Sequence, residues 1–288
     1  MLVSDFIKKL REHTYEHLFD DECYRRLDNV NRQFGHLVSH YVIWEAILSD
    51  EAKTVDCSIL CPYDTPYGKN FGYEMDYETC QTEHITPSCG VNISKVKDMK
   101  EMFYAARKIL TRMIPKDVII ALWPQIEKVS SMTFAWHGSV SDIAYMKGRG
   151  SDTRLKVFLQ YLTPEAVVSI LKDLGWNGDL SALERLLNEY ICYCKAERLM
   201  IDFSIDPHGI SSKVNVCISL KDQHTETVAA FLSHLIDNGL CLPEKAIDIM
   251  EFIEAGSSHI QNRITQFKLP FVGDKAVMAK VYLGQRAF

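Results

Sequence analysis

The feature that most constrains this chain is the order in which its predicted helices and strands follow one another. A helical region at 3–31 precedes two strand-like runs at 40–48 and 53–61. Three further strand pairs are predicted, at 132–138 with 154–162, at 198–206 with 213–221, and at 259–271 with 275–283. Further helices are predicted at 95–113, 116–129, 163–175, 181–195, 225–239 and 243–256. Strands that follow one another through short turns pair in an antiparallel manner. A parallel sheet would instead alternate single strands with single helices.

This order predicts an α+β fold in which one curved antiparallel sheet carries helices on its outer side. Closing such a sheet into a barrel removes its two edges, which otherwise invite pairing with other chains. No Gly/Ser-rich or Pro-rich linker divides the sequence. We therefore expect a single domain over 1–288, an antiparallel β-barrel of repeated helix–strand–strand–helix units surrounded by helices.

Composition narrows the partners and the compartment. The net charge is −6, and no basic stripe offsets it, so we expect no nucleic-acid partner. No uncharged apolar run approaches the roughly 20 residues that a membrane helix needs, so no membrane partner is expected. The N-terminus lacks the apolar core of a signal peptide, and nine irregularly spaced cysteines suit free thiols. These features favour a cytoplasmic protein.

Basic side chains recur on the predicted strands at positions that share one face. Arg154 and Lys156 alternate with apolar residues, and Lys280 shares a face with Tyr282. Further cations on the predicted strands are Lys53, which begins the second strand, Lys213 and Arg263. Lys268 lies on the same strand as Arg263 but at an odd spacing from it. Both side chains therefore face inward only if a β-bulge lies between them. In a barrel covered by helices the outer face is apolar and the inner face is free to be polar.

Cations that converge from several strands would build a positive pocket inside an acidic protein. A diphosphate suits such a pocket, because guanidinium and ammonium groups both bind its oxygens. The ordinary alternative for each of these residues is a solvated charge at a strand end. Their repetition on several strands favours the pocket.

Three stretches resemble the aromatic prenyltransferases of the αββα-barrel (ABBA) family: RLMIDFSIDPHGISSKVNVCISL, TRLKVFLQYLTPEAVVSILKDLGW and YVIWEAILSDEAKTVDCSILCP. Lys213 matches the lysine of a Lys-Val-Tyr strand, although Asn215 replaces its tyrosine. Arg154 and Lys156 match a diphosphate-binding pair. Tyr282 matches a tyrosine of the last strand. The length is similar to that of the phenol-prenylating branch or the cyanobactin peptide prenyltransferases.

The resemblance implies transfer of a dimethylallyl or geranyl group from its diphosphate to an electron-rich side chain, such as Trp or Tyr of a peptide, with release of pyrophosphate. Glu45 matches a catalytic glutamate that binds the acceptor's N–H or O–H. Asp56 stands near a position that often holds arginine, and a related branch has a metal-binding aspartate there. We expect no required cofactor, with Mg²⁺ optional at Asp56. The expected diphosphate ligands are Lys53, Arg154, Lys156, Lys213, Arg263, Lys280 and Tyr282.

The allyl cation formed in such a reaction needs shielding from water, and aromatic faces provide it through cation–π attraction. The inward-facing candidates besides Tyr282 are Trp136, Tyr161 and Phe203. For each of them, plain core packing is the alternative.

Three other functions remain open from the sequence. In the first, the protein prenylates a free indole or phenol instead of a peptide. In the second, the barrel binds an apolar or anionic ligand without catalysis. In the third, the barrel is filled by its own side chains and the protein serves as an interaction scaffold.

Overall fold

The computed structural model of this chain describes residues 1–65, 68–75, 89–92, 107, 111, 114–145 and 154–288. Its strands are β1 (Tyr41–Ile47), β2 (Asp56–Thr65), β3 (Gly68–Met75), β4 (Cys89–Asn92), β5 (Ser139–Tyr145), β6 (Leu155–Leu162), β7 (Leu199–Asp206), β8 (Gly209–Ile218), β9 (Ile260–Val272), β10 (Lys275–Ala276) and β11 (Lys280–Ala287). Its α-helices are α1 (Val3–Leu10), α2 (Asp21–Phe34), α4 (Lys116–Ala135), α5 (Pro164–Asp173), α6 (Leu180–Tyr190), α7 (Thr225–Asp237) and α8 (Pro243–Glu254). Apart from residues 107 and 111, the helix predicted at 95–113 lies outside the described residues.

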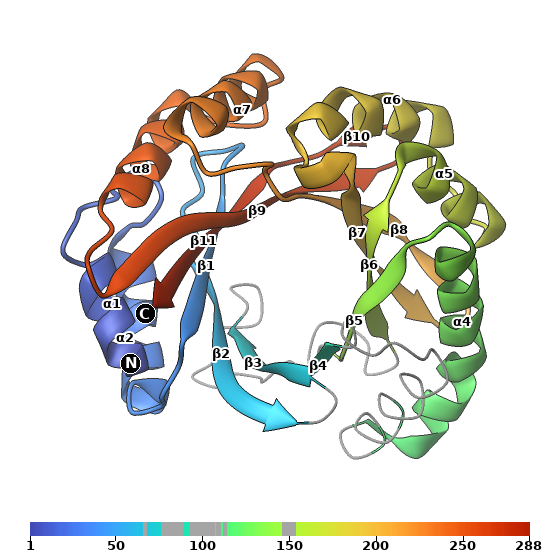
Figure 1. The fold of residues 1–288 in the computed structure, drawn as a ribbon, viewed down its shortest axis with the longest axis horizontal. Coiled ribbons are helices and arrows are strands. Elements are labelled where there is room, and N and C mark those ends of the chain that lie inside the picture. Colours follow the sequence, from blue (N-terminus) through green and yellow to red (C-terminus); the bar gives the residue numbers. More distant parts are fainter. Residues whose placement is uncertain (66–67, 76–88, 93–106, 108–110, 112–113, 146–153) are drawn as a thin grey trace.

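All these strands form one sheet in the order β3-β2-β1-β11-β9-β8-β7-β6-β5-β4, with β10 beside β9. Every pairing between neighbours is antiparallel. Figure 1 shows the sheet curling round on itself with the helices on its outer side. The α+β class and the antiparallel repeats are confirmed. Between β3 and β4, the ends of this order, no paired register is present in the described part of the chain, so full closure stays a prediction.

The two faces of each strand differ as the alternating sequence predicts. On β6, the side chains of Leu155, Val157 and Leu159 are fully buried towards the helices. Lys156 and Phe158 occupy the opposite face, which we call the inner face of the sheet. Burial of the apolar outer face under amphipathic helices drives this arrangement. The inner face is thereby left to carry polar groups.

The helix ends follow local capping chemistry. The Thr163 hydroxyl accepts a hydrogen bond of 3.3 Å from the backbone N–H of Ala166, and Pro164 begins α5. Thr163 is therefore the N-cap of α5. For α6 the N-cap is Asp179, which accepts a 2.9 Å hydrogen bond from the backbone N–H of Ala182.

One predicted strand is wrong. The segment 132–138 completes helix α4, and the strand of this unit is β5, which follows it. The buried positions Ile126, Val129, Ser130 and Thr133 follow the period of a helix, which continues through Pro124. The chain turns at Gly138, where a Cβ would lie 2.4 Å from the Leu162 side chain, so only glycine permits this close approach.

Strand β9 contains a bulge that decides which of its residues face inward. Its register with β11 shifts between Tyr282 and Leu283, leaving Thr265 as the extra residue. The backbone N–H of the next residue towards the N-terminus, Ile264, donates a 2.8 Å hydrogen bond to the side chain of Gln223. Because of the bulge, Arg263 and Lys268 share the inner face despite their odd spacing.

Among the described residues, no helix combines the length and the apolar character needed to cross a bilayer.

Candidate functional site

Three lysines from three strands meet on the inner face: Lys156 of β6, Lys268 of β9 and Lys280 of β11. Lys268 and Lys280 lie directly opposite each other in the β9–β11 register. Two carboxylates, Asp202 and Glu45, lie among them and bind their ammonium groups. We call these five residues, together with Asp56, Tyr282 and Phe158 on the same face, the inner-face network.

Asp202 on β7 holds two of the lysines together. Its carboxylate oxygens lie 3.2 Å from the Nζ of Lys156 and 3.1 Å from the Nζ of Lys268. The amide of Asn215 donates a 2.5 Å hydrogen bond to Asp202 Oδ1, and the Cys217 thiol lies 3.5 Å from Oδ2. Burial alone would raise the pKa of Asp202, but the two ammonium groups and Asn215 hold it well below its usual range. The carboxylate is therefore ionised at neutral pH.

Glu45 on β1 forms the other half of the network. It accepts a 2.7 Å hydrogen bond from the Nζ of Lys280, and it lies opposite Tyr282 in the β1–β11 register. Burial opposes ionisation, but the attraction of Lys280 and Lys268 lowers the pKa of Glu45 to about 2. With that pKa, Glu45 is a weak proton acceptor as long as Lys280 stays bound to it.

The network is balanced in charge. Its three lysines face three carboxyl groups, since the buried Asp56 lies opposite Glu45 and adds its carboxyl group to those of Glu45 and Asp202. Burial alone would lower the pKa of Lys280, but Glu45, and after it Asp56, raise that pKa. Buried charges are stable only when they are paired in this way. A polyanionic ligand would have to compete with these carboxylates for the lysines. The predicted positive pocket for a diphosphate stays a prediction.

Aromatic faces lie beneath the ammonium groups. The Nζ of Lys268 is 4.8 Å from the ring centre of Tyr282 and 5.9 Å from that of Phe158. The Nζ of Lys156 is 5.1 Å from the Phe158 ring centre. Both rings therefore already stabilise positive charge on the inner face through cation–π attraction.

The other predicted diphosphate ligands lie farther from this network. Arg154 and Lys213 lie on the inner face, at the rim of the sheet where Asp206 ends β7. Arg154 Nε is 3.6 Å from Asp206 Oδ2. Arg263 lies on the inner face towards the opposite rim. Lys53 was expected to begin a strand, but β2 starts at Asp56 and Lys53 lies in the preceding loop. Burial lowers the pKa of Lys245 on α8, and the charge of Lys53 adds to that effect.

Three of the predicted cation-shielding aromatics do not face inward. Phe203 is on the outer face of β7 with Ile201 and Ile205, and only 1% of it is exposed. Trp136 caps the C-terminus of α4 and is 41% exposed, because the segment is a helix end. Tyr161 is 58% exposed and has a positive φ of 64° at the register shift in β6. Of the four candidates, only Tyr282 lies in the network.

Among the described residues, Asp56 has few oxygen ligands around it, and Mg²⁺ binding at Asp56 stays a prediction. Asp56 and Glu45 lie opposite each other on β2 and β1, but the ammonium group of Lys280 already binds the Glu45 carboxylate. Mg²⁺ needs several oxygen ligands in octahedral geometry. Within the described ranges, three or more His, Cys, Asp or Glu side chains nowhere come together as metal ligands.

Sequence reasoning missed Asp202, Asn215 and Phe158 as members of the site. The signal was present in RLMIDFSID, where Met200, Asp202 and Ser204 alternate with apolar residues. A carboxylate in the middle of a buried strand needs a cation opposite it, and Lys268 was the cation left unassigned.

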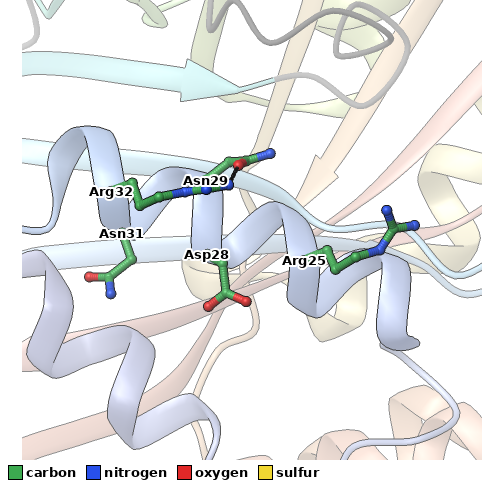
Figure 2. A pocket seen from close by; sticks show the side chains of 5 residues that line it. All are labelled: Arg25, Asp28, Asn29, Asn31 and Arg32. Atoms are coloured by element: carbon green, nitrogen blue, oxygen red, sulfur yellow. Dashed lines mark hydrogen bonds between the residues drawn. The ribbon is translucent and has the colours of Figure 1, made fainter.

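A separate surface hollow of about 450 Å³ lies on the outer helix α2. Figure 2 shows its lining side chains, all of which come from that helix: Arg25, Asp28, Asn29, Asn31 and Arg32. Arg11 binds Asp28 at 2.8 Å, so part of its charge is paired. None of the predicted site residues contributes to it.

Comparison with known proteins bears on the fold. No family model matches the sequence, and no curated protein matches it. Among solved structures, AnaPT from Neosartorya fischeri has a TM-score of 0.54 and is 10% identical, and the match covers 100% of this chain and 92% of AnaPT. This chain shares the AnaPT fold. The NotF prenyltransferase has a TM-score of 0.42 at 10% identity, over 99% of this chain and 70% of NotF.

At 10% identity the similarity establishes the architecture. Activity has to be argued from the side chains.

Proposed function

We propose that this protein is a prenyltransferase that moves a dimethylallyl or geranyl group from its diphosphate to an electron-rich aromatic side chain of a peptide. The observation that carries the proposal is the convergence of Lys156, Lys268 and Lys280 from three strands of an αββα-type sheet beside two aromatic faces. A diphosphate needs several cations, and an allyl cation needs aromatic shielding. The inner-face network provides both kinds of group.

The reaction begins when the bond between the allylic carbon and the diphosphate oxygen breaks. Pyrophosphate leaves with the electron pair, and negative charge grows on its oxygens. Lysines that are already oriented stabilise that charge without further reorganisation. The π electrons of the acceptor then form the new carbon–carbon bond, and the acceptor loses a proton to restore its aromaticity.

The rings of Tyr282 and Phe158 would lie beside the allyl cation. Each already has a lysine ammonium group within 6 Å of its ring centre. Each such face contributes about 0.5–2 kcal/mol of cation–π stabilisation. Phe158 thus takes the shielding role that was first assigned to Trp136, Tyr161 and Phe203.

Glu45 can act as a base only after the Lys280 ammonium group leaves it to bind the diphosphate of the prenyl donor. The two are joined at 2.7 Å, and the diphosphate of the donor competes with Glu45 for the same ammonium group. Loss of that cation raises the pKa of the buried carboxylate. Glu45 would then accept a hydrogen bond, and later a proton, from the acceptor's N–H or O–H. No metal is required in this scheme.

A mass-gain assay tests the proposal. The protein is incubated with dimethylallyl or geranyl diphosphate and with peptides that contain Trp, Tyr, His or Arg, alongside free indole and phenol. We expect one prenyl mass on a Trp or Tyr peptide. Lys268→Gln should abolish it, whereas Lys172→Gln on the exposed side of α5 should not. Transfer only to free indole or phenol would correct the acceptor class. No adduct on any acceptor would contradict the proposal.

One observation favours a second function. Because Glu45, Asp56 and Asp202 already balance the three lysines, the inner face suits a barrel that binds a ligand without catalysis. Such a protein would bind a prenyl diphosphate and leave it intact. Quantifying released pyrophosphate beside binding separates the two functions.

A further inference from the structure

Two arginines lie on the inner face at the rim opposite Asp206. Arg263 of β9 pairs with Gly284 of β11 in the register, and Arg286 is two residues farther along β11. Residues related by this diagonal across neighbouring strands have Cα atoms about 7–8 Å apart, within reach of long side chains. We call Arg263 and Arg286 the rim arginine pair.

Arg263 differs from the cations of the inner-face network. Lys156, Lys268 and Lys280 each bind a carboxylate within 4 Å. For Arg263 no carboxylate lies within that distance among the described residues, and its Nε is buried with no hydrogen-bond partner. A buried guanidinium nitrogen without an acceptor costs free energy, so the position suits a ligand that supplies one.

Polar side chains lie on the strands next to Arg263. Tyr41 on β1 reaches across Gly284 and hydrogen-bonds the hydroxyl of Thr265 on β9. A Cβ at residue 284 would lie 2.2 Å from the Tyr41 hydroxyl oxygen and 2.7 Å from Thr265 Oγ1, so only glycine allows this crossing. Tyr41 and Thr265 therefore form a polar platform beside the guanidinium.

We propose that the rim arginine pair binds the carboxylate of the acceptor, so that the enzyme selects acceptors ending in an α-carboxylate. A guanidinium binds a carboxylate through two parallel hydrogen bonds, which suits Arg263. This inference rests on the proposed prenyl transfer, and it identifies the acceptor class. A peptide C-terminus and a free aromatic amino acid both carry this group.

The spacing along the strands suits such an acceptor. Glu45 and Tyr41 are four residues apart on β1, which corresponds to roughly 13 Å. A carboxylate held at the Tyr41 end leaves the attached aromatic ring directed towards Tyr282 and Glu45. The diphosphate would then bind beyond it, at the lysines. The donor and acceptor sites thus divide the inner face between them.

The experiment measures binding by calorimetry with four probes: L-tryptophan, L-tryptophanamide, the peptide Gly-Gly-Trp and its C-terminal amide. For the wild type we expect each acid to bind at least about tenfold more tightly than its amide. Arg263→Gln should remove that preference, and Arg263→Lys should retain part of it. Arg185→Gln, at an exposed position of α6, should leave it unchanged. The two acids distinguish a free amino acid from a peptide end.

Equal affinity for acid and amide, an unchanged preference in Arg263→Gln, or no binding of any probe would overturn the inference. Its failure is distinct from failure of the proposed function. Prenyl transfer without any preference for acids removes only the carboxylate site. A preference for acids without transfer from any donor removes only the prenyltransferase assignment.

Discussion

Lys280 donates a 2.7 Å hydrogen bond to Glu45 across neighbouring strands, and this pair joins the two halves of the proposed chemistry. One partner is a cation suited to the leaving diphosphate, and the other is the carboxylate suited to the acceptor. In the proposed mechanism, each group holds the other inactive until a ligand separates them. The pair would then couple binding of the prenyl donor to activation of the base.

Glu45→Gln should separate donor binding from transfer. The amide keeps the shape of the side chain but leaves the Lys280 charge without its partner, so the inner face becomes more positive. We expect the affinity for a prenyl thiolodiphosphate, which does not react, to rise several-fold in calorimetry. Transfer should fall by about 10²-fold or more, since the general base is lost. Weaker donor binding in Glu45→Gln would refute the coupling.

Stability should depend on acid pH through Glu45. Its pKa falls from an ordinary value of 4.5 to about 2 in the folded protein. The stabilisation is therefore complete above about pH 4.5 and is lost as the pH falls towards 2, on the order of 3 kcal/mol in all. Urea unfolding across this range should show a smaller loss for Glu45→Gln than for the wild type. Identical pH profiles of stability in the two proteins would contradict the lowered pKa of Glu45. Asp202 does not account for the difference, because it is present in both proteins.

Asp202→Asn should be far more costly than Asp206→Asn. Asp202 is fully buried between Lys156 and Lys268, whereas Asp206 meets Arg154 at 3.6 Å where both side chains are partly exposed. Removing one partner of a buried ion pair costs about 3–5 kcal/mol, and an exposed pair contributes about 0–1 kcal/mol. Chemical denaturation measures both changes. Similar losses in the two variants would mean that the network is not held by buried charge.

The alternation of apolar and polar residues was sufficient to predict the antiparallel repeats and the inner position of Lys156. It could place Arg263 and Lys268 on one face only on condition of a bulge, which the structure contains. Lys268 lies five positions after Arg263, and a regular strand would place the two on opposite faces. The bulge at Thr265 depends on Gln223, which is about forty positions away in sequence. Local patterning does not contain that contact.

The aromatic assignments failed for a related reason. Phe203 lies one residue from Asp202, so a strand that buries both of its faces gives little sign of which is inner. The inner face of β7 can be recognised only when Asp202 is paired with the lysines of β6 and β9. For Trp136, the helical period of the preceding residues extended farther than the proline at 124 suggested.

Gln223→Ala should loosen the β9 bulge. The substitution removes the acceptor of the Ile264 N–H, and a buried donor left without a partner costs about 1–3 kcal/mol. We expect faster exchange of the Ile264 amide hydrogen and weaker binding of carboxylate-bearing acceptors at Arg263. Binding of the prenyl diphosphate should be preserved. Gln223→Glu retains an acceptor oxygen and should behave like the wild type. Unchanged exchange at Ile264 in Gln223→Ala would show that the bulge is maintained by other contacts.

The central claim is that Lys156, Lys268 and Lys280 together bind a prenyl diphosphate, and calorimetric titration with dimethylallyl thiolodiphosphate tests it most directly. We predict measurable binding to the wild type, at least about tenfold weaker binding to Lys268→Gln, and wild-type affinity in Lys172→Gln. Circular dichroism establishes that each variant is folded. Absence of binding to the folded wild type, or equal affinity in Lys268→Gln, would contradict the account.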